Sequence, residues 1–361
     1  MKKVLVLGCT GSIGTNAINI IKNMQDDFCL CGVTAHSNKQ KLEQICKDFN
    51  TTGFLTSEKG PDCIKELIEK QKPDIVVNGI AGSAGLIPSK IVLESGTDLA
   101  LANKETVVMA WNLIKDLGAK NNAKIIPVDS EHSAVFNLIN QAGKDNVDEI
   151  IITASGGPFR TYTKEQLKTV TLKDALKHPT WSMGQKITID SATLANKGLE
   201  VIEANRLFDK PVDKIKVVVH PQSLVHSLVR TNDGMLYAQI SDPDMKHPIY
   251  GALTYPHNKK CYLKPFDLFD CEMTFYKPRT DDFPMLDYAF KAAGLNGSYT
   301  IAYNAANEVA VDAFINGKIG FTQIADLVYK VLQKDWTAVP NDFSCVYEMD
   351  KLARRIALES L

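Results

Sequence analysis

The heptapeptide VDSEHSA places two carboxylates, Asp129 and Glu131, two positions apart. Ser130 lies between them and His132 follows directly. In an extended segment, side chains two positions apart point to the same side, so both carboxylates could face one ion. A solvated turn capped by Ser130 or Ser133 would use the same residues without any chemistry. The motif alone therefore leaves a hydrolytic dyad, a metal site and a capped turn open.

A third carboxylate follows further along the chain. Residues 187–208 are predicted to join a strand to a helix, with Asn196, Lys197 and Glu200 near the start of the helix. Lys197 and Glu200 are three positions apart and so share one helical face. Glu200 could be a third oxygen ligand, while Lys197, Asn196 and Ser191 could hold a phosphate. Three carboxylates without a thiolate or histidine cluster favour Mg²⁺ or Mn²⁺ over zinc.

Two loops could complete such a site. Residues 155–157 read Ser-Gly-Gly after an expected strand, which leaves backbone N–H groups free to bind an anion. The second loop, 178–184, contains His178, Trp181 and Met183, and has Gly184 as a possible hinge. If its Trp and Met are exposed, they favour a lid that excludes water, and a Trp packed in a core is the alternative.

These residues must be positioned by regular elements, and the clearest of them opens the chain. The apolar run Val4 to Leu7 predicts a buried parallel strand, and Gly8, Gly11 and Gly14 follow at intervals of three before a helical pattern. Strand, glycine turn and helix in this order point backbone N–H groups at a pyrophosphate. A tight turn without a ligand is the alternative for a bare glycine pattern.

Further strands and helices alternate after this turn. Strands are expected at 29–35, 74–78 and 98–102, and helices at 39–49 and 61–70. Repeated units of this kind imply a doubly wound parallel sheet. Small residues at 78–86 would let a ligand approach the backbone, and the strand at 98–102 ends in polar residues where open sheets bind ligands: Asn103, Lys104 and Glu105.

The end of the second strand bears on the cofactor. An NAD site usually has Asp or Glu there to bind the ribose 2′-hydroxyl. This chain has His36, Ser37, Asn38 and Lys39 instead, whose donors suit a 2′-phosphate and favour NADP. A polar loop that caps the next helix at Ser37 or Asn38 is compatible with the same residues.

Composition limits the remaining classes. The 361 residues predict two or three domains, and a net charge of −1 provides no overall field for nucleic acid or anionic lipid. The eight cysteines include no CxxC pair, and the apolar run at the start is too short for a secretion signal. No apolar stretch approaches the ~20 residues that span a bilayer. We therefore expect a soluble, cytoplasmic protein that binds neither nucleic acid nor membrane.

The last third of the sequence is predicted to be a linker followed by helices. Regular patterning is lost from about residue 256, with prolines and charges typical of a linker. Helical patterns follow beyond 283 and predict a small bundle. Asn304, Asn307 and Glu308 form its polar cluster, for which capping or a buried network is expected rather than catalysis.

Eight motifs occur in a characteristic order: GCTGSIG, LANKE, PVDSEHSA, SGGPFR, HPTWSMG, DSATLANKGLE, HPQSLVHSLVR and DPDM. With them the chain resembles the 1-deoxy-D-xylulose 5-phosphate reductoisomerase family. These are NADPH-dependent enzymes of the methylerythritol phosphate route to isoprenoid precursors. The resemblance runs from residue 1 into the C-terminal helical region, and VDSEH followed by DSATLANKGLE is its most specific part.

The resemblance implies a role for each matching residue. The catalytic set would be Lys104 and three acids that bind one Mg²⁺, Mn²⁺ or Co²⁺ ion, Asp129, Glu131 and Glu200. The phosphate of the sugar substrate would be held, with His178 closing over it, by Ser155, Ser191, Asn196 and Lys197. Further substrate contacts would come from Lys104, Ser130, His226 and Trp181, and also from the metal ligands Glu131 and Glu200. Trp181 and Met183 would lie on the lid. NADPH would be bound by Thr10, Gly11, Ser12, Ile13, His36, Ser37, Asn38, Asn103, Glu105, Gly184, Pro243 and Met245.

One departure from the family concerns the 2′-phosphate. Many members carry Gly-Lys/Arg-Asn where this chain has His36-Ser37-Asn38. The positive charge would then come from Lys39 or His36.

The expected architecture is α/β with three parts. A Rossmann-like doubly wound parallel sheet over 1–127 would bind NADPH. A central α+β domain over 128–255 would carry the metal site, the lid and the homodimer contact that the resemblance implies. A linker over 256–280 would lead to a helical bundle over 281–361.

The reaction implied is the conversion of 1-deoxy-D-xylulose 5-phosphate to 2-C-methyl-D-erythritol 4-phosphate. Coordination to the ion acidifies a hydroxyl and polarises a carbonyl while a carbon–carbon bond moves, and hydride from NADPH then reduces the aldehyde.

Two rival functions remain for comparison. An aldehyde dehydrogenase of the aspartate-semialdehyde type needs an activated Cys, and the sequence has none between Cys63 and Cys261. A nucleotide-sensing protein without catalysis would need neither three acids nor a phosphate site.

Overall fold

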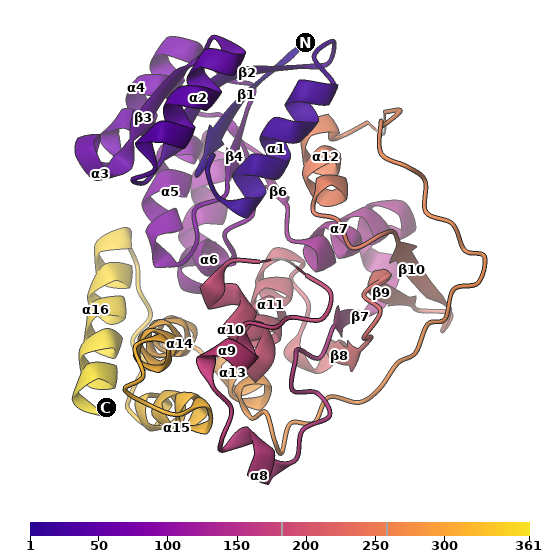
Figure 1. The fold of residues 1–361 in the computed structure, drawn as a ribbon, viewed down its shortest axis with the longest axis vertical. Helices are drawn as coiled ribbons and strands as arrows, with labels where there is room; N and C mark the ends of the chain where they lie inside the picture. The colour runs from indigo at the N-terminus through magenta and orange to yellow at the C-terminus, as the bar shows by residue number, and fades with distance from the viewer. Residues whose placement is uncertain (182, 258) are drawn as a thin grey trace. The chain divides into compact units, whose positions relative to one another are not determined.

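The computed structural model describes residues 1–181, 183–257 and 259–361 (Figure 1). Within them the chain folds as two compact units, and each is described by itself. The first unit comprises Met1–Thr106, Trp111–Ser133 and Asp244–Pro265. The second unit comprises Val107–Ala110, Ala134–Pro243 and Phe266–Leu361.

The first unit is built on a six-stranded parallel sheet with the order β3-β2-β1-β4-β5-β6. This is the order of doubly wound dinucleotide-binding folds, in which the ligand crevice lies where the order reverses, between β1 and β4. The predicted Rossmann-like sheet is therefore confirmed. Its strands are β1 Lys2–Leu7, β2 Phe28–Ala35, β3 Thr52–Leu55, β4 Ile75–Asn78, β5 Asp98–Leu101 and β6 Ile125–Pro127.

Helices follow these strands as the apolar periodicity predicts. In α1 the buried residues Ala17, Ile20 and Ile21 lie on one face, the spacing that packs a helix onto a sheet. α6 contributes residues to both units and is non-helical at Ala110 (φ −143°). The helices are α1 Ser12–Asn23, α2 Lys39–Phe49, α3 Thr56–Lys59, α4 Asp62–Gln71, η1 Ser83–Gly85, α5 Leu86–Glu94, α6 Lys104–Lys120 and α12 Lys246–Thr254.

Helix α12 belongs to the first unit, although residues up to 255 were expected in the central domain. It packs against α1, β5 and β6, and its Ile249 and Leu253 are fully buried. Lys2 Nζ also donates to Leu253 O at 2.8 Å. The boundary differs because α12 buries its apolar face against elements more than 100 residues earlier, a contact that local sequence pattern does not reveal.

The second unit contains a four-stranded mixed sheet with the order β10-β9-β7-β8. β7 and β8 are parallel, whereas β9 is antiparallel to both of its neighbours. The strands are β7 Val147–Ala154, β8 Ile215–Val219, β9 Val225–Thr231 and β10 Leu236–Ile240. Helices surround them: α7 Ser130–Ala142 (shared with the first unit), η2 Lys144–Asn146, α8 Lys164–Leu167, α9 Leu172–Ala175, α10 Gln185–Thr193, α11 Ala195–Leu207 and η3 Val212–Lys214.

The strand expected at the start of residues 187–208 is wrong, because these residues form α10. The β-branched residues of the run ITID favour a strand locally. In the structure α10 packs against α11 and α14, and Ile189 is fully buried. Tertiary packing therefore overrides the local preference, and Leu194 (φ +62°) links α10 directly to α11.

The expected C-terminal helices are confirmed, and they share one hydrophobic core with the four-stranded sheet. α14 packs against both α15 and α16 (Figure 1). The rings of Phe159 and Phe321 meet with centroids 5.0 Å apart, which ties the segment after β7 to α15. The helices are α13 Met285–Gly294, α14 Tyr299–Ile315, α15 Phe321–Leu332 and α16 Phe343–Glu359.

Among the residues that the structure describes, none of the helices combines the length and apolar character needed to cross a bilayer.

Candidate functional site

The glycine turn after β1 has the form of an anion-binding site. Gly8 adopts φ +75°, and α1 begins at Ser12 after the extended N-cap residue Gly11. A Cβ on Gly14 would lie 2.3 Å from the carbonyl oxygen of Gly8, so only glycine lets α1 approach the turn this closely. The predicted cofactor residues Thr10 to Ile13 thus lie at the N-terminus of α1, where N–H groups and the helix dipole favour a phosphate.

The segment after β4 lies against this turn. A Cβ on Gly79 would lie 3.0 Å from Cβ of Ile13, and a Cβ on Gly8 would lie 3.1 Å from the oxygen of Gly79. The exits of β1 and β4 are therefore packed backbone to backbone at the point where the strand order reverses. This agrees with the expectation that small residues at 78–86 allow close approach of a ligand.

Asn103 and Glu105 support the segment after β4. Asn103 caps α6 by accepting from Thr106 N at 3.0 Å, and its Nδ2 donates to Gly82 O at 2.8 Å and to Glu105 Oε2 at 2.9 Å. Both predicted cofactor residues are buried. Their observed contacts are with the protein, and they fix the loop that follows β4.

The predicted 2′-phosphate segment lies between β2 and α2 and ends at Asn38, the N-cap residue of α2. His36, Ser37 and Asn38 are all exposed at the carboxyl end of β2. His36 Nδ1 lies 3.3 Å from Thr56 Oγ1, and Asn38 caps α2 by accepting from Lys41 N at 3.1 Å. The capping alternative is thus correct for Asn38, while the side chain of Ser37 faces solvent.

Lys41, which the sequence analysis did not single out, reaches back to the glycine turn. Its Nζ donates to Thr10 O at 3.1 Å and to Thr15 Oγ1 at 3.2 Å. The only sequence signal for this position is its place three residues after the cap Asn38, in the first turn of α2.

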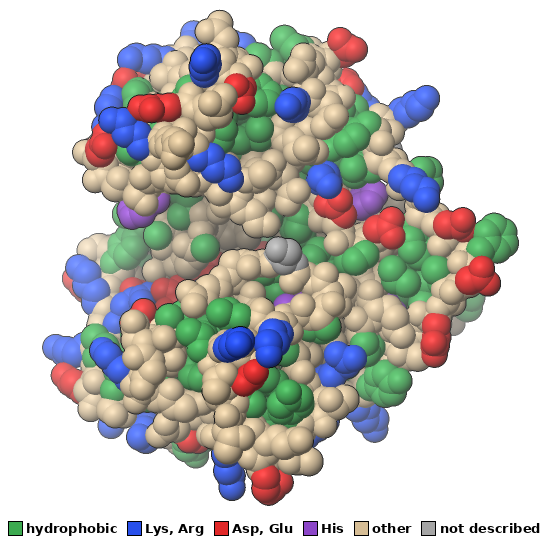
Figure 2. All heavy atoms as spheres, in the orientation of Figure 1, with side chains coloured by type: hydrophobic (Ala, Val, Ile, Leu, Met, Phe, Trp, Pro, Cys, Tyr) green, Lys and Arg blue, Asp and Glu red, His purple; other side chains and the backbone are tan. Residues whose placement is uncertain are grey.

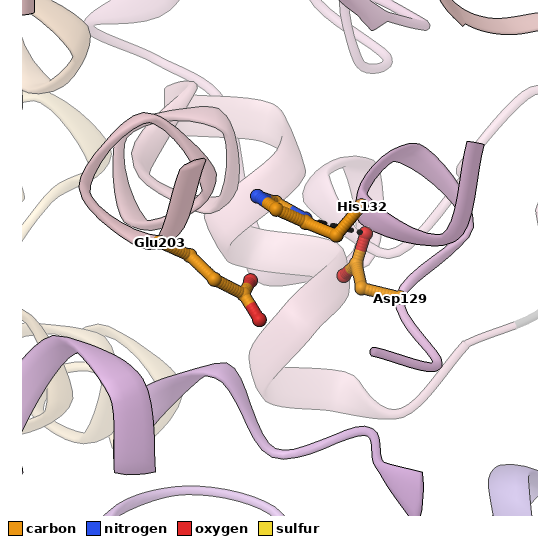
Figure 3. A group of neighbouring side chains, drawn as sticks. All are labelled: Asp129, His132 and Glu203. Atoms are coloured by element: carbon orange, nitrogen blue, oxygen red, sulfur yellow. Dashed lines mark hydrogen bonds and ion pairs between the residues drawn. The ribbon is translucent and has the colours of Figure 1, made fainter. Parts of the chain in front are cut away.

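Asp129 of the first unit is paired with two basic side chains. Its Oδ2 lies 2.6 Å from Lys104 Nζ, and its Oδ1 lies 3.5 Å from His132 Nδ1, the contact dashed in Figure 3. Burial alone would raise the pKa of Asp129, but the Lys104 ammonium and the His132 imidazole outweigh it and hold that pKa well below its usual value. The carboxyl group is therefore an anion that can act as a metal ligand or accept hydrogen bonds. Glu203, also drawn in Figure 3, belongs to α11 of the second unit.

The motif VDSEHSA is not extended through Glu131, because α7 begins at Ser130. The premise of an extended segment is therefore wrong, but a carboxylate oxygen of Asp129 and one of Glu131 still lie within 4.8 Å of each other, as expected for two ligands of one ion. Glu131 N donates to Asp129 Oδ1 at 3.3 Å, and Ser130 Oγ donates to Glu131 Oε2 at 2.7 Å. Asp129, rather than Ser130 or Ser133, makes the capping contact, so a helix start and two carboxylates occur in the same four residues.

In the second unit, His178 connects two serines. His178 Nε2 lies 3.0 Å from Ser155 Oγ and 3.1 Å from Ser191 Oγ. Ser155 follows β7 and Ser191 lies in α10, so the structure brings together residues 36 positions apart that were predicted to bind a phosphate. Gly156 and Gly157, which directly follow Ser155, adopt φ +83° and +68°, as the predicted Ser-Gly-Gly turn requires.

The hydrogen bonds of His178 define its protonation. Nδ1 accepts from Thr180 N at 3.2 Å and from Trp181 N at 2.9 Å, so the ring proton is on Nε2. Burial, and then the charge of Arg160, lower the pKa of His178 to about 4. At neutral pH this residue is a neutral donor that faces the two serine hydroxyls.

The first two turns of α11 carry the predicted Asn196, Lys197 and Glu200. Lys197 Nζ lies 2.5 Å from Glu200 Oε2, and Asn196 Nδ2 donates to Glu200 Oε1 at 2.6 Å. Lys197 and Glu200 are 4% and 1% exposed, so this is a buried ion pair rather than a solvated surface. Since Lys197 has three N–H donors, it can bind Glu200 and a phosphate oxygen together.

Sequence analysis missed a buried contact that supports α10. Asn307 Nδ2 of α14 donates to Asp190 Oδ1 at 2.8 Å, and Lys186 Nζ lies 2.8 Å from Asp190 Oδ2. Asp190 directly precedes Ser191, so α14 fixes the helix that presents this serine. The buried network expected for Asn307 is confirmed, but its partner in α10 had no local sequence signal.

The expected lid, 178–184, is tied down at its start by the His178 contacts. The rings of Trp181 and His226 meet with centroids 6.4 Å apart, and His226 Nε2 is 2.8 Å from Ser241 Oγ. Gly184 is exposed and precedes α10 in the second unit, with open space around a Cβ. Ser182, within the same loop, lies outside the described residues.

Met245 directly precedes α12 and is half-buried in the first unit, the unit that contains the glycine turn. Its neighbours Asp244 and Lys246 form an ion pair of 2.7 Å.

Over the face drawn in Figure 2, basic and acidic side chains are interspersed, in keeping with the net charge of −1. A phosphorylated ligand must therefore be bound by local contacts of the kind described above.

The fold defines a class, a dinucleotide-dependent oxidoreductase, and the side chains described above add carboxylates and a group of hydroxyl, imidazole and ammonium donors. The family description "1-deoxy-D-xylulose 5-phosphate reductoisomerase" matches residues 4–60 and 54–111. The descriptions of its C-terminal domains match residues 125–208 and 240–356. The chain belongs to the 1-deoxy-D-xylulose 5-phosphate reductoisomerase family, and the resemblance stated from the motifs is confirmed.

Individual relatives agree over the whole chain. The 1-deoxy-D-xylulose 5-phosphate reductoisomerase of Treponema denticola is 52% identical, over 99% of this chain and 96% of that protein. The solved structure of the Zymomonas mobilis enzyme with NADPH has a TM-score of 0.91 and 36% identity, covering 99% of this chain and 98% of the other. A reductoisomerase solved with NADPH, fosmidomycin and magnesium has a TM-score of 0.89 and 36% identity, with the same coverage.

Proposed function

We propose that this chain carries out its family's reaction with Asp129 and Glu131 of the first unit and Glu200 of the second as ligands of one divalent ion. The reaction is the NADPH- and metal-dependent isomerisation and reduction of 1-deoxy-D-xylulose 5-phosphate to 2-C-methyl-D-erythritol 4-phosphate, which supplies isoprenoid precursors. The observation that carries the residue assignment is the buried Lys197–Glu200 pair, which follows Ser191, a serine that contacts His178, by six and nine residues.

The donor set is the right one for such an ion. All three proposed ligands are carboxylates, the hard oxygen donors that Mg²⁺ and Mn²⁺ prefer. Asp129 is held in its anionic form, and both oxygens of Glu200 are oriented by Asn196 and Lys197. When bound, the ion would polarise the carbonyl and acidify the hydroxyl of the substrate.

The remaining groups bind and orient the substrate. The hydroxyls of Ser155 and Ser191, the Nε2–H of His178 and the ammonium of Lys197 supply donors for the three phosphate oxygens. Lys104 is ion-paired with Asp129, and Ser130 donates a hydrogen bond to Glu131. From these positions both residues would contact substrate oxygens beside the nicotinamide. Phosphate binding holds the substrate while bonds rearrange at its other end.

The cofactor would bind along the carboxyl edge of the six-stranded sheet. Thr10, Gly11, Ser12 and Ile13 lie at the N-terminus of α1, which suits the pyrophosphate. Asn103 and Glu105 shape the loop after β4, and Met245 provides an apolar side chain in the same unit. The first unit thus binds NADPH and also supplies Lys104, Asp129 and Glu131. The second unit supplies Glu200 and the proposed phosphate donors, and it carries the lid with Trp181 and Gly184.

The experiment that tests the ligand set removes one carboxylate at a time. In Glu131→Gln and Glu200→Gln, Mn²⁺ affinity measured by titration should fall by tenfold or more, about 1.4 kcal/mol. NADPH binding to both variants should persist, because the cofactor residues are untouched. Glu94→Gln, an exposed change in α5, is the matched control. Unchanged Mn²⁺ affinity in either ligand variant would rule that residue out as a ligand.

We also propose that the protein is a homodimer joined through the second unit. Among the described residues β10 is an edge strand whose one partner is β9, and it exposes apolar side chains. Met235, Leu236, Tyr237 and Ile240 are 58%, 47%, 48% and 37% exposed. An apolar edge of this kind invites pairing with a second copy. Light scattering should give twice the chain mass, and Leu236→Lys should shift it toward one chain mass; a monomeric wild-type protein would contradict the proposal.

A cytoplasmic location completes the proposal. All eight cysteines are free thiols, which suits a reducing compartment. Burial raises the pKa of Cys9 and of Cys31 to about 12, so neither offers the thiolate that the rival aldehyde dehydrogenase needs. Fractionation of cells that express the protein should recover it with soluble cytoplasmic markers, and recovery with secreted proteins would contradict this location.

A further inference from the structure

The 2′-phosphate segment lacks a cation at the two positions where many family members carry Gly-Lys or Gly-Arg. Positions 36–38 read His-Ser-Asn, and the imidazole of His36 is directed to Thr56 Oγ1. An ammonium or guanidinium is the usual partner of a phosphate dianion, because charge-assisted hydrogen bonds are the strong ones. The charge must therefore come from elsewhere if NADPH is to be distinguished from NADH.

Lys41 lies where that charge is needed. It is in the first turn of α2, and its backbone N–H is bound by the side chain of Asn38. Its Nζ reaches Thr10 O of the glycine turn and Thr15 Oγ1 of α1. The Lys41 side chain therefore bridges the first turn of α2 and the glycine turn that follows β1.

The sheet register explains why this bridge lies at the cofactor. β1 and β2 are parallel neighbours in which Leu7 is paired with Thr34, so both strands end at the same edge. In doubly wound folds the adenosine ribose lies over the end of the second strand, beside the glycine turn. An ammonium that is carried by the first turn of α2 and contacts the glycine turn is therefore adjacent to the ribose 2′ position.

Lys41 also has the capacity to bind a phosphate. Its side chain is exposed, and its two observed acceptors are neutral oxygens. Within the described part of the chain its ammonium has no carboxylate partner. An ammonium has three N–H donors, so one donor and the full charge remain available.

We propose that Lys41 is the residue that selects NADPH over NADH in this chain, by binding the 2′-phosphate. This inference rests on the proposed function, since it assumes that the glycine turn binds the dinucleotide. It replaces Lys39 and His36 as the source of the charge. Lys39 is the first residue of α2 and is exposed, without a side-chain contact to the glycine turn among the described residues.

The test measures dissociation constants of NADPH and NADH by calorimetry for the wild-type protein and five variants. Lys41→Met should weaken NADPH binding about tenfold or more and leave NADH binding within about twofold, because only NADPH carries the 2′-phosphate. Lys41→Arg should retain most of the preference. Lys47→Met, which removes an exposed charge from the last turn of the same helix, should change neither constant.

Two results would overturn the inference. An equal loss of NADPH and NADH affinity in Lys41→Met would show that Lys41 only braces the glycine turn. A preserved NADPH preference in Lys41→Met, with loss of preference in Lys39→Met or His36→Gln, would assign the charge to those residues. If the wild-type protein bound neither dinucleotide, the proposed function itself would fail, an outcome that is distinct from both.

Discussion

Gly14 and Gly11 are predicted to respond differently to the same substitution, because glycine serves a different purpose at each position. A Cβ on Gly14 would lie 2.3 Å from Gly8 O and 2.5 and 2.9 Å from Cα and C of Cys9. All three atoms belong to the backbone, so no side-chain rotation relieves the clash. Helix α1 or the turn must move, and overpacking of this kind costs about 1–3 kcal/mol.

Gly11 has room for a side chain in the free protein. Its φ is −80°, which any residue adopts, and the nearest atom to an added Cβ is Gly8 O at an ordinary 3.5 Å. Gly11→Ala should therefore change the free energy of unfolding by less than about 1 kcal/mol. Its methyl group would nevertheless stand where the pyrophosphate approaches the backbone, so NADPH affinity should fall by about tenfold or more.

Thermal unfolding and NADPH titration of both variants test this reasoning. Gly14→Ala should lower the unfolding midpoint by several degrees, at about 2–4 °C per kcal/mol, and weaken NADPH binding as the turn shifts. Gly11→Ala should keep the midpoint and lose NADPH affinity alone. A stable Gly14→Ala with wild-type affinity, or a Gly11→Ala that binds NADPH normally, would refute the assignment of these glycines.

Three further predictions concern polar groups: the half-buried His178 and the buried Asn307 and Lys104. The pKa of His178 is lowered from 6.5 to about 4, so the unfolded chain takes up a proton below pH 6.5 that the folded chain excludes until about pH 4. The stability of the wild-type protein should therefore fall as the pH is lowered from 6.5 to 4. The His178→Gln variant should lose less stability over the same range. Asn307→Ala removes a donor from the buried Asp190 and should cost about 1–3 kcal/mol in urea unfolding and raise the substrate KM. Lys104→Met leaves the carboxylate of Asp129 without its ammonium and should cost about 3 kcal/mol, measured in the same way.

Each of these has a contrary result. Parallel pH profiles of wild-type and His178→Gln midpoints would show that His178 is not a buried neutral imidazole. Wild-type stability and KM in Asn307→Ala would remove α14 from the support of α10. Unchanged urea unfolding of Lys104→Met would show that Asp129 does not depend on this cation.

The parallel sheet could be predicted because its information is local. Continuous apolar runs such as Val4 to Leu7, glycines at turns and one-sided helices each define an element without reference to the rest of the chain. The strand order then follows from the general preference of repeated βα units. The short strand Thr52–Leu55 was missed because four residues give too little pattern.

Long-range packing explains the errors. Residues 187–189 are β-branched, yet burial against α11 and α14 makes them helical. Helix α12 joins the first unit because α1 covers it, across more than 200 residues of sequence. Neither contact leaves a local pattern.

The candidate site likewise combines residues that the sequence singles out and partners that only the fold reveals. Residue types pointed to the carboxylates and the proposed phosphate donors, since few other side chains perform those functions. The partners that orient them, such as Asn307 for Asp190 and the turn N–H groups for His178, come from the fold. Lys41 escaped notice because an exposed lysine in a helix is ordinary until its contact with Thr10 is seen.

The most direct test of the account follows the loss of NADPH absorbance with 1-deoxy-D-xylulose 5-phosphate in Mg²⁺ or Mn²⁺, before and after EDTA. We predict oxidation that needs the metal and that Glu131→Gln abolishes while the variant still binds NADPH. Oxidation that persists in EDTA or in Glu131→Gln would contradict the metal assignment. A folded protein that binds NADPH but oxidises none of it in either metal would contradict the reductoisomerase activity.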